Sequence, residues 1–206
     1  MLGSESEDGR MSLPKERFSL SIADYLAGER DGAVRHEYVG GQAYAMAGAS
    51  ARHNRIAGNI FARLNDHLDG ADCEPFISDM KIRVSPDLFY YPDVVVTCDE
   101  PGGDAYFRTE PRLIIEVLSP TTERIDRHEK LAAYRNCPSV QEYALVSQEG
   151  MMIELHRRSN DEWQTLFFTE PDERCAVESI GLTMSLSDIY RNVRFDDGAE
   201  DQGRAS

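Results

Sequence analysis

Two acidic residues set in hydrophobic runs, with a lysine further along the chain, are the residues most able to do chemistry here. Asp93 precedes three valines, and Glu116 lies within the run Leu113 to Leu118. Such β-branched runs predict buried strands, where an unpaired carboxylate would cost free energy. A shared divalent cation is the simplest partner, because Mg²⁺ takes oxygen ligands from one or two carboxylates plus waters. The pattern therefore predicts a hydrolytic metal site.

Lys130 lies in the helix that we expect after the second run. Asp126 is four residues before it and Tyr134 is four residues after it. Residues at this spacing share one face of a helix, so both side chains could orient the lysine. As an ammonium, Lys130 would orient a water or stabilise negative charge that develops on a phosphate.

A metal-free arrangement explains the same acids without catalysis. Either carboxylate could form a buried ion pair, and the candidate partners are Arg112, Lys81 and Lys130. A lysine at the position of Lys130 is also typical of a solvated helix face. Both explanations stay open from the sequence alone.

Periodicity and turn residues predict the elements that would hold these side chains. Apolar spacings of three and four over 50–68 indicate an amphipathic helix, which Gly70 ends. Gly40-Gly41 predicts a tight hairpin, because glycine takes positive φ readily. The expected elements are a short helix capped by Ser21, hairpin strands 35–39 and 42–46, the helix 50–68, strands 74–84, 89–97 and 112–118, a helix from Thr121 or Thr122 to about 136, a strand 140–147, and a hairpin of 151–157 and 162–168.

This order differs from the strict alternation of a doubly wound sheet. We expect an α/β (α+β) fold with a central mixed sheet flanked by helices, an N-terminal helix and β-hairpin, and a C-terminal hairpin. The length of 206 residues suits one domain. We place that domain at 18–194, between polar tails at 1–17 and 195–206 that we expect to be disordered.

Composition restricts the partners. The net charge of −15 and the pI of about 4.7 oppose broad electrostatic binding to nucleic acid, which depends on Lys and Arg displacing counterions. A local basic face can coexist with an acidic body, and the segments 52–55 and 124–135 are the first that we would offer to a phosphate. Some aromatic residues could stack on bases, and these are Tyr90, Tyr91, Tyr106 and Phe107. Such residues more often pack in a core.

The cysteines show neither zinc-ligand spacing nor the density of a secreted disulfide framework. We expect free thiols, mostly buried, at Cys73, Cys98, Cys137 and Cys175. No apolar stretch approaches the roughly 20 residues that span a bilayer, and 1–17 lacks the apolar centre of a signal peptide. A cytoplasmic protein with no membrane partner is the expectation.

Three motifs together resemble the PD-(D/E)XK nuclease superfamily. They are Tyr-Pro-Asp at 91–93, Glu-Val-Leu-Ser-Pro at 116–120, and Asp-x-x-x-Lys-x-x-x-Tyr at 126–134. More narrowly, they are similar to its large bacterial family of small restriction-endonuclease-like proteins, over about 18–190. In the superfamily's basic pattern the lysine follows the second acid by two residues, where this chain has Leu118. Lys130, on the following helix, is the residue that matches.

The resemblance implies a metal-dependent endonuclease that hydrolyses phosphodiester bonds in DNA, with Mg²⁺ or Mn²⁺ as cofactor. Asp93 and Glu116 would be metal ligands, with the backbone carbonyl of Val117 as a further oxygen. Lys130 would be the catalytic lysine. The accessory candidates are Glu37, His53, Asp126 and Tyr134. For His53 a structural role at the start of the helix is slightly favoured, and for Glu37 pairing across the hairpin weighs about equally.

Two other functions stay open. A non-catalytic member of the fold would serve as a binding or assembly module, which the acidic charge and the displaced lysine favour. A metal-dependent phosphohydrolase of small nucleotides would need a closed pocket, whereas an endonuclease needs a basic cleft beside Asp93. A homodimer would place two sites for a double-strand cut.

Overall fold

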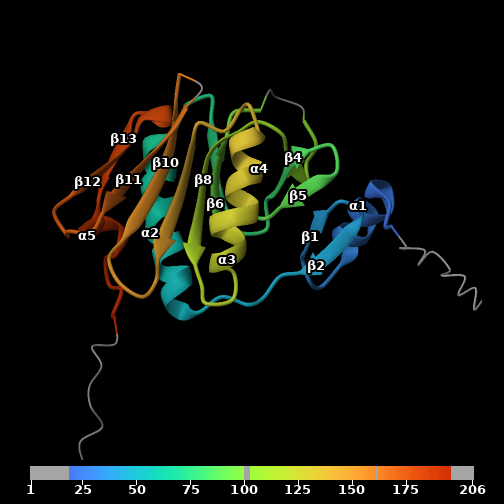
Figure 1. Ribbon diagram of the computed structural model, residues 1–206, viewed down its shortest axis with the longest axis horizontal. Coiled ribbons are helices and arrows are strands. Elements are labelled where there is room, and N and C mark those ends of the chain that lie inside the picture. Colours follow the sequence, from blue (N-terminus) through green and yellow to red (C-terminus); the bar gives the residue numbers. More distant parts are fainter. Residues whose placement is uncertain (1–18, 100–102, 161, 196–206) are drawn as a thin grey trace, which may run out of the picture.

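A six-stranded mixed sheet organises residues 19–99, 103–160 and 162–195, which this computed structural model describes (Figure 1). In chain order the elements are α1 (Ile22–Asp31), β1 (His36–Val39), β2 (Gln42–Ala45), α2 (Ala51–His67), β3 (Glu74–Ile77), β4 (Lys81–Ser85), β5 (Leu88–Tyr90), β6 (Val94–Thr97), β7 (Phe107–Arg108), β8 (Pro111–Leu118), α3 (Glu123–Ile125), the π-helical turn η1 (Asp126–Lys130), α4 (Leu131–Asn136), β9 (Glu142–Ser147), β10 (Ile153–Ser159), β11 (Glu162–Phe168), β12 (Arg174–Val177), the 3₁₀ turn η2 (Glu178–Ile180), β13 (Leu182–Ser185) and α5 (Leu186–Ile189).

The main sheet has the strand order β11-β10-β9-β8-β6-β3. The β8–β9 pair is parallel, and the other pairs are antiparallel. Helix α2 covers one face, and α3 to α4 cover the other (Figure 1). This arrangement confirms the expected mixed α+β fold with helices on both faces of a central sheet.

Side-chain alternation along β8 decides which way Glu116 points. Ile115 and Val117 belong to the core that α2 covers, whereas Ile114 and Leu118 belong to the core under α4. Successive side chains of a strand face opposite sides. Glu116 therefore faces α3 to α4, the side from which a lysine of that helix can reach it.

A second, five-stranded sheet, β2-β1-β5-β4-β7, lies beside the first together with α1 (Figure 1). The predicted hairpin at its edge is confirmed, with Gly40 and Gly41 at φ of 53° and 91°. A small aromatic core of Tyr25, Tyr38 and Phe89 joins α1 to this sheet.

The predicted strands 74–84 and 89–97 were wrong in extent, because each is split between the two sheets. The first breaks at Ser78 and Asp79, which both have positive φ. The second breaks between β5 and β6, where Pro92 has a fixed φ and no N–H for a ladder. Asp93 therefore lies at a bend just before β6, and its carbonyl accepts a hydrogen bond from Ser78 N at 2.9 Å.

The helix predictions are confirmed with one irregularity. Ser21 and Ser50 cap α1 and α2, since each hydroxyl accepts a backbone N–H three residues on. Thr122 stands at the start of the later helix without a capping side-chain bond, and that helix contains the π-helical turn η1 before it ends at Asn136.

The C-terminal part contains more elements than we expected. The hairpin β10–β11 is followed by a second hairpin, β12–β13, and by α5. The predicted tails fall on residues outside the described ranges, except for Phe195, whose ring lies 5.6 Å from that of Tyr190. No helix among the described residues has the length and apolar character to cross a membrane.

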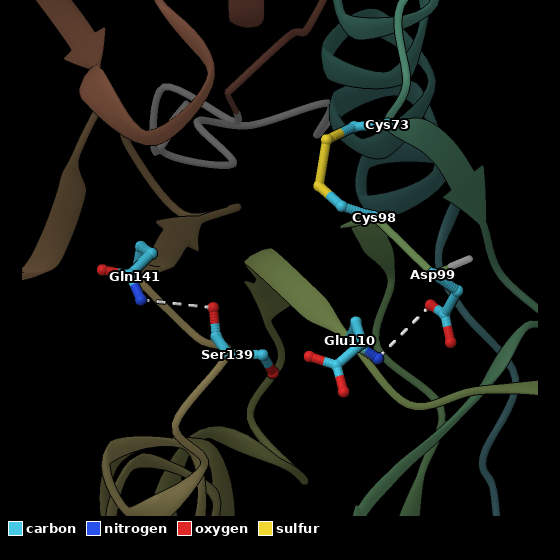
Figure 2. Close-up of a disulfide and its surroundings, with 6 residues drawn as sticks. All are labelled: Cys73, Cys98, Asp99, Glu110, Ser139 and Gln141. Atoms are coloured by element: carbon cyan, nitrogen blue, oxygen red, sulfur yellow. Dashed lines mark hydrogen bonds between the residues drawn. A yellow bond between two sulfur atoms is a disulfide. The ribbon is translucent and has the colours of Figure 1, made fainter.

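The expectation of four free thiols was wrong. Cys73 and Cys98 form a disulfide (Figure 2), while Cys137 and Cys175 are free and buried. The bridge follows from strand pairing, because Glu74 and Thr97 are partners in the β3–β6 ladder and the two cysteines flank that pair. Spacing along the chain gives no sign of this pairing.

Removing the bridge by Cys73→Ser with Cys98→Ser should lower the free energy of unfolding by about 3 kcal/mol, since the cross-link limits the unfolded chain. Urea unfolding with and without reductant measures the change. The double variant serves as the control, because reductant should leave it unaffected. Alkylation of four thiols in the unfolded, unreduced wild type would contradict the bridge.

Candidate functional site

The ammonium of Lys130 is the centre of the site. The side chain is buried, and its Nζ lies 2.9 Å from Glu116 Oε1, 3.0 Å from Glu37 Oε1 and 3.3 Å from Asp126 Oδ1. These carboxylates come from β8, from β1 and from η1, the turn that carries the lysine itself. The fold thus joins three separate parts of the chain around one buried charge.

Asp93 lies next to Glu116 and is held by backbone groups. Its Oδ2 accepts a hydrogen bond from Val117 N at 2.7 Å, and its own N–H donates to Glu116 Oε2 at 3.3 Å. The two acids therefore stand side by side where β6 begins and β8 ends. The sequence predicted this neighbourhood, although it placed Asp93 inside a strand.

His53 contacts the acids from the opposite side of the sheet. It lies in the first turn of α2, and its Nε2 is 3.0 Å from Asp93 Oδ2. Burial lowers the pKa of His53, but the hydrogen bond and charge of Asp93, with a backbone bond to Val117, outweigh burial and raise it. The ring thus contacts Asp93. A histidine that only satisfied backbone groups at the start of the helix would not need this contact.

Tyr134 supports Glu116 from behind. Its ring is fully buried under the sheet, and its hydroxyl donates to Glu116 Oε1 at 3.4 Å. Burial raises the pKa of Tyr134 well above its ordinary value, so the hydroxyl keeps its proton. It is therefore a neutral donor to the carboxylate that Lys130 also contacts.

Negative charge exceeds positive charge in this cluster. Burial raises the pKa of Glu116 well above its usual range, and the nearby acids add to this effect, while Lys130 opposes it. Burial lowers the pKa of Lys130, but its carboxylate neighbours outweigh burial and raise it well above normal. Four carboxylates thus surround one ammonium and one imidazole, which favours uptake of a further cation.

The cluster forms the floor of a pocket of about 510 Å³. Glu37, His53, Asp93, Glu116, Asp126 and Lys130 all line it, whereas Val117 and Tyr134 stand behind this floor. The rest of the lining includes the run 44–50, the run 119–122, Ile125 and Gln148. The predicted site residues are therefore brought together at one accessible cavity.

The donor set fits a hydrated hard cation. Within the described residues no group of three or more His, Cys, Asp or Glu side chains is arranged as a metal cage. Asp93 and Glu116 nevertheless offer two adjacent carboxylates, and Mg²⁺ uses one or two carboxylates plus waters. The fit is to a cation that keeps most of its water.

The predicted phosphate-binding segments do not line the pocket as a basic cleft. Arg127 pairs with Glu123 and Glu154, and the guanidinium of Arg135 lies over Trp163. Within the described part of the pocket wall, the basic residues are Lys130 and His53. The substrate would meet few unpaired cations here.

The other aromatic and ionic candidates also have different roles. Of the proposed stacking residues, Tyr90 and Tyr91 are buried, Phe107 packs in the small core, and Tyr106 is exposed but outside the pocket wall. Among the alternative partners of the acids, the ion pair that forms is with Lys130. Lys81 instead lies over the rings of Tyr25 and Tyr91.

Sequence reasoning missed the polar wall of the pocket. The hydroxyls of Ser119, Thr121 and Thr122 line it, and Gln148 reaches it from the end of β9. Gln148 Nε2 donates to Leu118 O at 2.9 Å, because β8 and β9 are parallel and end at the same edge. The position of the Ser-Pro-Thr-Thr run directly after the Glu116 strand was the available signal.

Comparisons with known proteins agree with this architecture. The model of the Uma2 family, described as "Putative restriction endonuclease", matches residues 22–187. The chain is 40% identical over 179 residues to uncharacterized protein slr1290 of Synechocystis sp., covering 85% of this chain and 94% of the relative. It is 34% identical over 146 residues to uncharacterized protein sll1609 of Synechocystis sp., covering 69% and 82%.

A solved structure shares the fold. It is described as a putative nuclease belonging to DUF820 from Anabaena variabilis, with a TM-score of 0.62, 20% sequence identity, and coverage of 75% of this chain and 89% of that one. At this identity the likeness concerns the fold alone.

The two lysines of the described chain give a matched test of the buried network. Lys130→Met should lower the free energy of unfolding by about 3 kcal/mol or more, because it leaves buried carboxylates without their cation. Lys81→Met should be close to neutral, because burial lowers the pKa of Lys81 and no carboxylate among the described residues pairs with it. Urea unfolding at neutral pH compares them. Equal losses in the two variants would contradict the network.

Proposed function

The chain belongs to the Uma2 family, and on that premise we propose that it is a metal-dependent endonuclease that hydrolyses phosphodiester bonds in DNA. The observation that carries the proposal is the buried Lys130 among three carboxylates, next to Asp93 on the floor of an accessible pocket. A purely structural ion pair has no use for an open pocket beside it, whereas a reacting phosphate must have space to reach the charged groups.

Two carboxylates would hold the metal. Asp93 and Glu116 would be its protein ligands, with the carbonyl of Val117 as a further oxygen. A bound Mg²⁺ or Mn²⁺ supplies a water of lowered pKa and stabilises charge on the phosphate. His53 would keep Asp93 in place through its contact with Oδ2.

Lys130 would act as a fixed positive charge. Its neighbours raise its pKa, so it stays an ammonium with three N–H donors. One of these donors can turn to a phosphate oxygen while the others remain on Glu116 and Glu37. Asp126 and Tyr134 would be positioning residues, since they contact Lys130 and Glu116 and lie under the reacting group.

A second candidate is a metal-dependent phosphohydrolase of small nucleotides. The cavity of about 510 Å³ lies in the range of small-molecule sites, roughly 300–1,000 Å³. The two basic residues that line it are already paired. A non-catalytic module of the same fold is the third candidate, and it requires no affinity for metal at the acids.

Two further predictions concern assembly and location. A homodimer would bring two sites to one duplex, and light scattering tests it, since a monomer at high concentration would contradict it.

A cytoplasmic location stays a prediction. The bridge between Cys73 and Cys98 argues against that location, because disulfides persist mainly in oxidising compartments.

Calorimetry with Mg²⁺ and Mn²⁺, with cleavage of plasmid and of single-stranded DNA on the same samples, tests the proposal. Asp93→Ala and Glu116→Ala should each abolish cleavage and weaken metal binding at least tenfold, because either change leaves one carboxylate ligand. Glu110→Ala is the matched control, since Glu110 is exposed just before the other end of β8 and does not line the pocket.

The outcomes separate the three candidates. Metal binding without cleavage of plasmid or of single-stranded DNA, but with hydrolysis of small nucleotides, would favour the phosphohydrolase. If the wild-type protein binds neither cation, the acids have a structural role, and the non-catalytic module is the remaining candidate.

A further inference from the structure

An exposed aromatic side chain stands beside the acid cluster. Tyr44 of β2 is 51% exposed and lines the pocket. Its register partner in the hairpin is Glu37, and directly opposed residues of an antiparallel pair share one face of the sheet. Glu37 in turn lies 3.0 Å from Lys130 Nζ. Glu37 is therefore next to both Tyr44 and Lys130, the candidate catalytic lysine.

The mouth of the pocket is apolar. The run 44–49 of its lining reads Tyr-Ala-Met-Ala-Gly-Ala, and Ile125 lines the same pocket. Met46 is 37% exposed and Ile125 is 36% exposed. Gathered exposed apolar side chains on a folded protein mark a binding surface. This mouth suits a flat apolar group.

The ring of Tyr44 is available for such a group. Its hydroxyl donates to Gln42 Oε1 at 2.7 Å, on the exposed edge of the sheet. Every described residue of β2 is exposed, and no aromatic or cation–π partner of Tyr44 occurs among the described residues. Both faces of the ring are therefore free of stacking partners in that part of the chain.

The charges of the pocket argue against an occupant that is held mainly through its phosphates, as a duplex is. Such binding needs Lys and Arg along the phosphates and is strongest for the densely charged duplex, but the basic residues of the described wall are Lys130 and His53, each bonded to a carboxylate. In a duplex the base faces are covered by their neighbours. An unpaired base offers its face, and stacking on aromatic side chains tolerates any base.

We propose that this site takes single-stranded nucleic acid, with an unpaired base stacked on Tyr44 near the exposed Met46 and Ile125, and with the adjoining phosphate at a cation that Asp93 and Glu116 would hold. The inference rests on the proposed nuclease function and specifies its substrate class. Affinity comes from stacking in the mouth, and Asp93 and Glu116 would hold a cation that could receive the phosphate.

Fluorescence anisotropy in Ca²⁺ tests the proposal with three labelled probes, namely oligothymidine, an abasic strand of the same length, and the matching duplex. Wild type should bind oligothymidine more tightly than the other two. Tyr44→Ala should weaken binding of oligothymidine about tenfold, the loss typical of one stacked base, and leave the abasic strand unchanged. Tyr44→Phe keeps the ring and should bind like wild type.

Tyr106→Ala is the matched control, since Tyr106 is 56% exposed and lies outside the pocket wall. Equal or tighter binding of the duplex, wild-type affinity in Tyr44→Ala, or no binding of any strand would each overturn the inference. Addition of Mg²⁺ to the same samples keeps the two proposals distinct. Tyr44-dependent binding without cleavage refutes only the nuclease, whereas duplex cleavage unaffected by Tyr44→Ala refutes only the substrate class.

Discussion

Burial of one ammonium among three carboxylates is the interaction on which the rest of the site depends. An ion removed from water costs several kcal/mol unless close partners replace the lost hydration. Lys130 meets that need only if η1, β1 and β8 keep their relative positions. The five-stranded sheet is thereby tied to the six-stranded one through Glu37, and the pocket lies at their junction.

The sequence predicted the fold class and several of the residues that meet at this site, but not the details of the scaffold that positions them. Glu116 in an apolar run and Lys130 on the next helix could be paired because an unpaired buried charge is so costly. The bend at Asp93 was missed although Pro92 precedes it, because periodicity reports burial and both halves of that run are buried, in different sheets. The Cys73 to Cys98 bridge depends on strand register, and Tyr44 lies on a short exposed strand without a periodic signal.

The acidic character of the chain has a local counterpart in the site. Four carboxylates outnumber the ammonium and the imidazole beside them. Burial raises the pKa values of Glu116 and Asp126, and the neighbouring acids add to this effect. A divalent cation would offset the excess without a basic groove. Family membership supports the proposed nuclease, and in that proposal the phosphate would be bound through a metal and a single lysine.

Crystals of the protein soaked in Mn²⁺ and measured at the manganese absorption edge would test this account most directly. The account predicts an anomalous peak in contact with the carboxylates of Asp93 and Glu116, with the ammonium of Lys130 still beside Glu116. A peak elsewhere, or an acid cluster without any peak in a well-ordered soaked crystal, would contradict it.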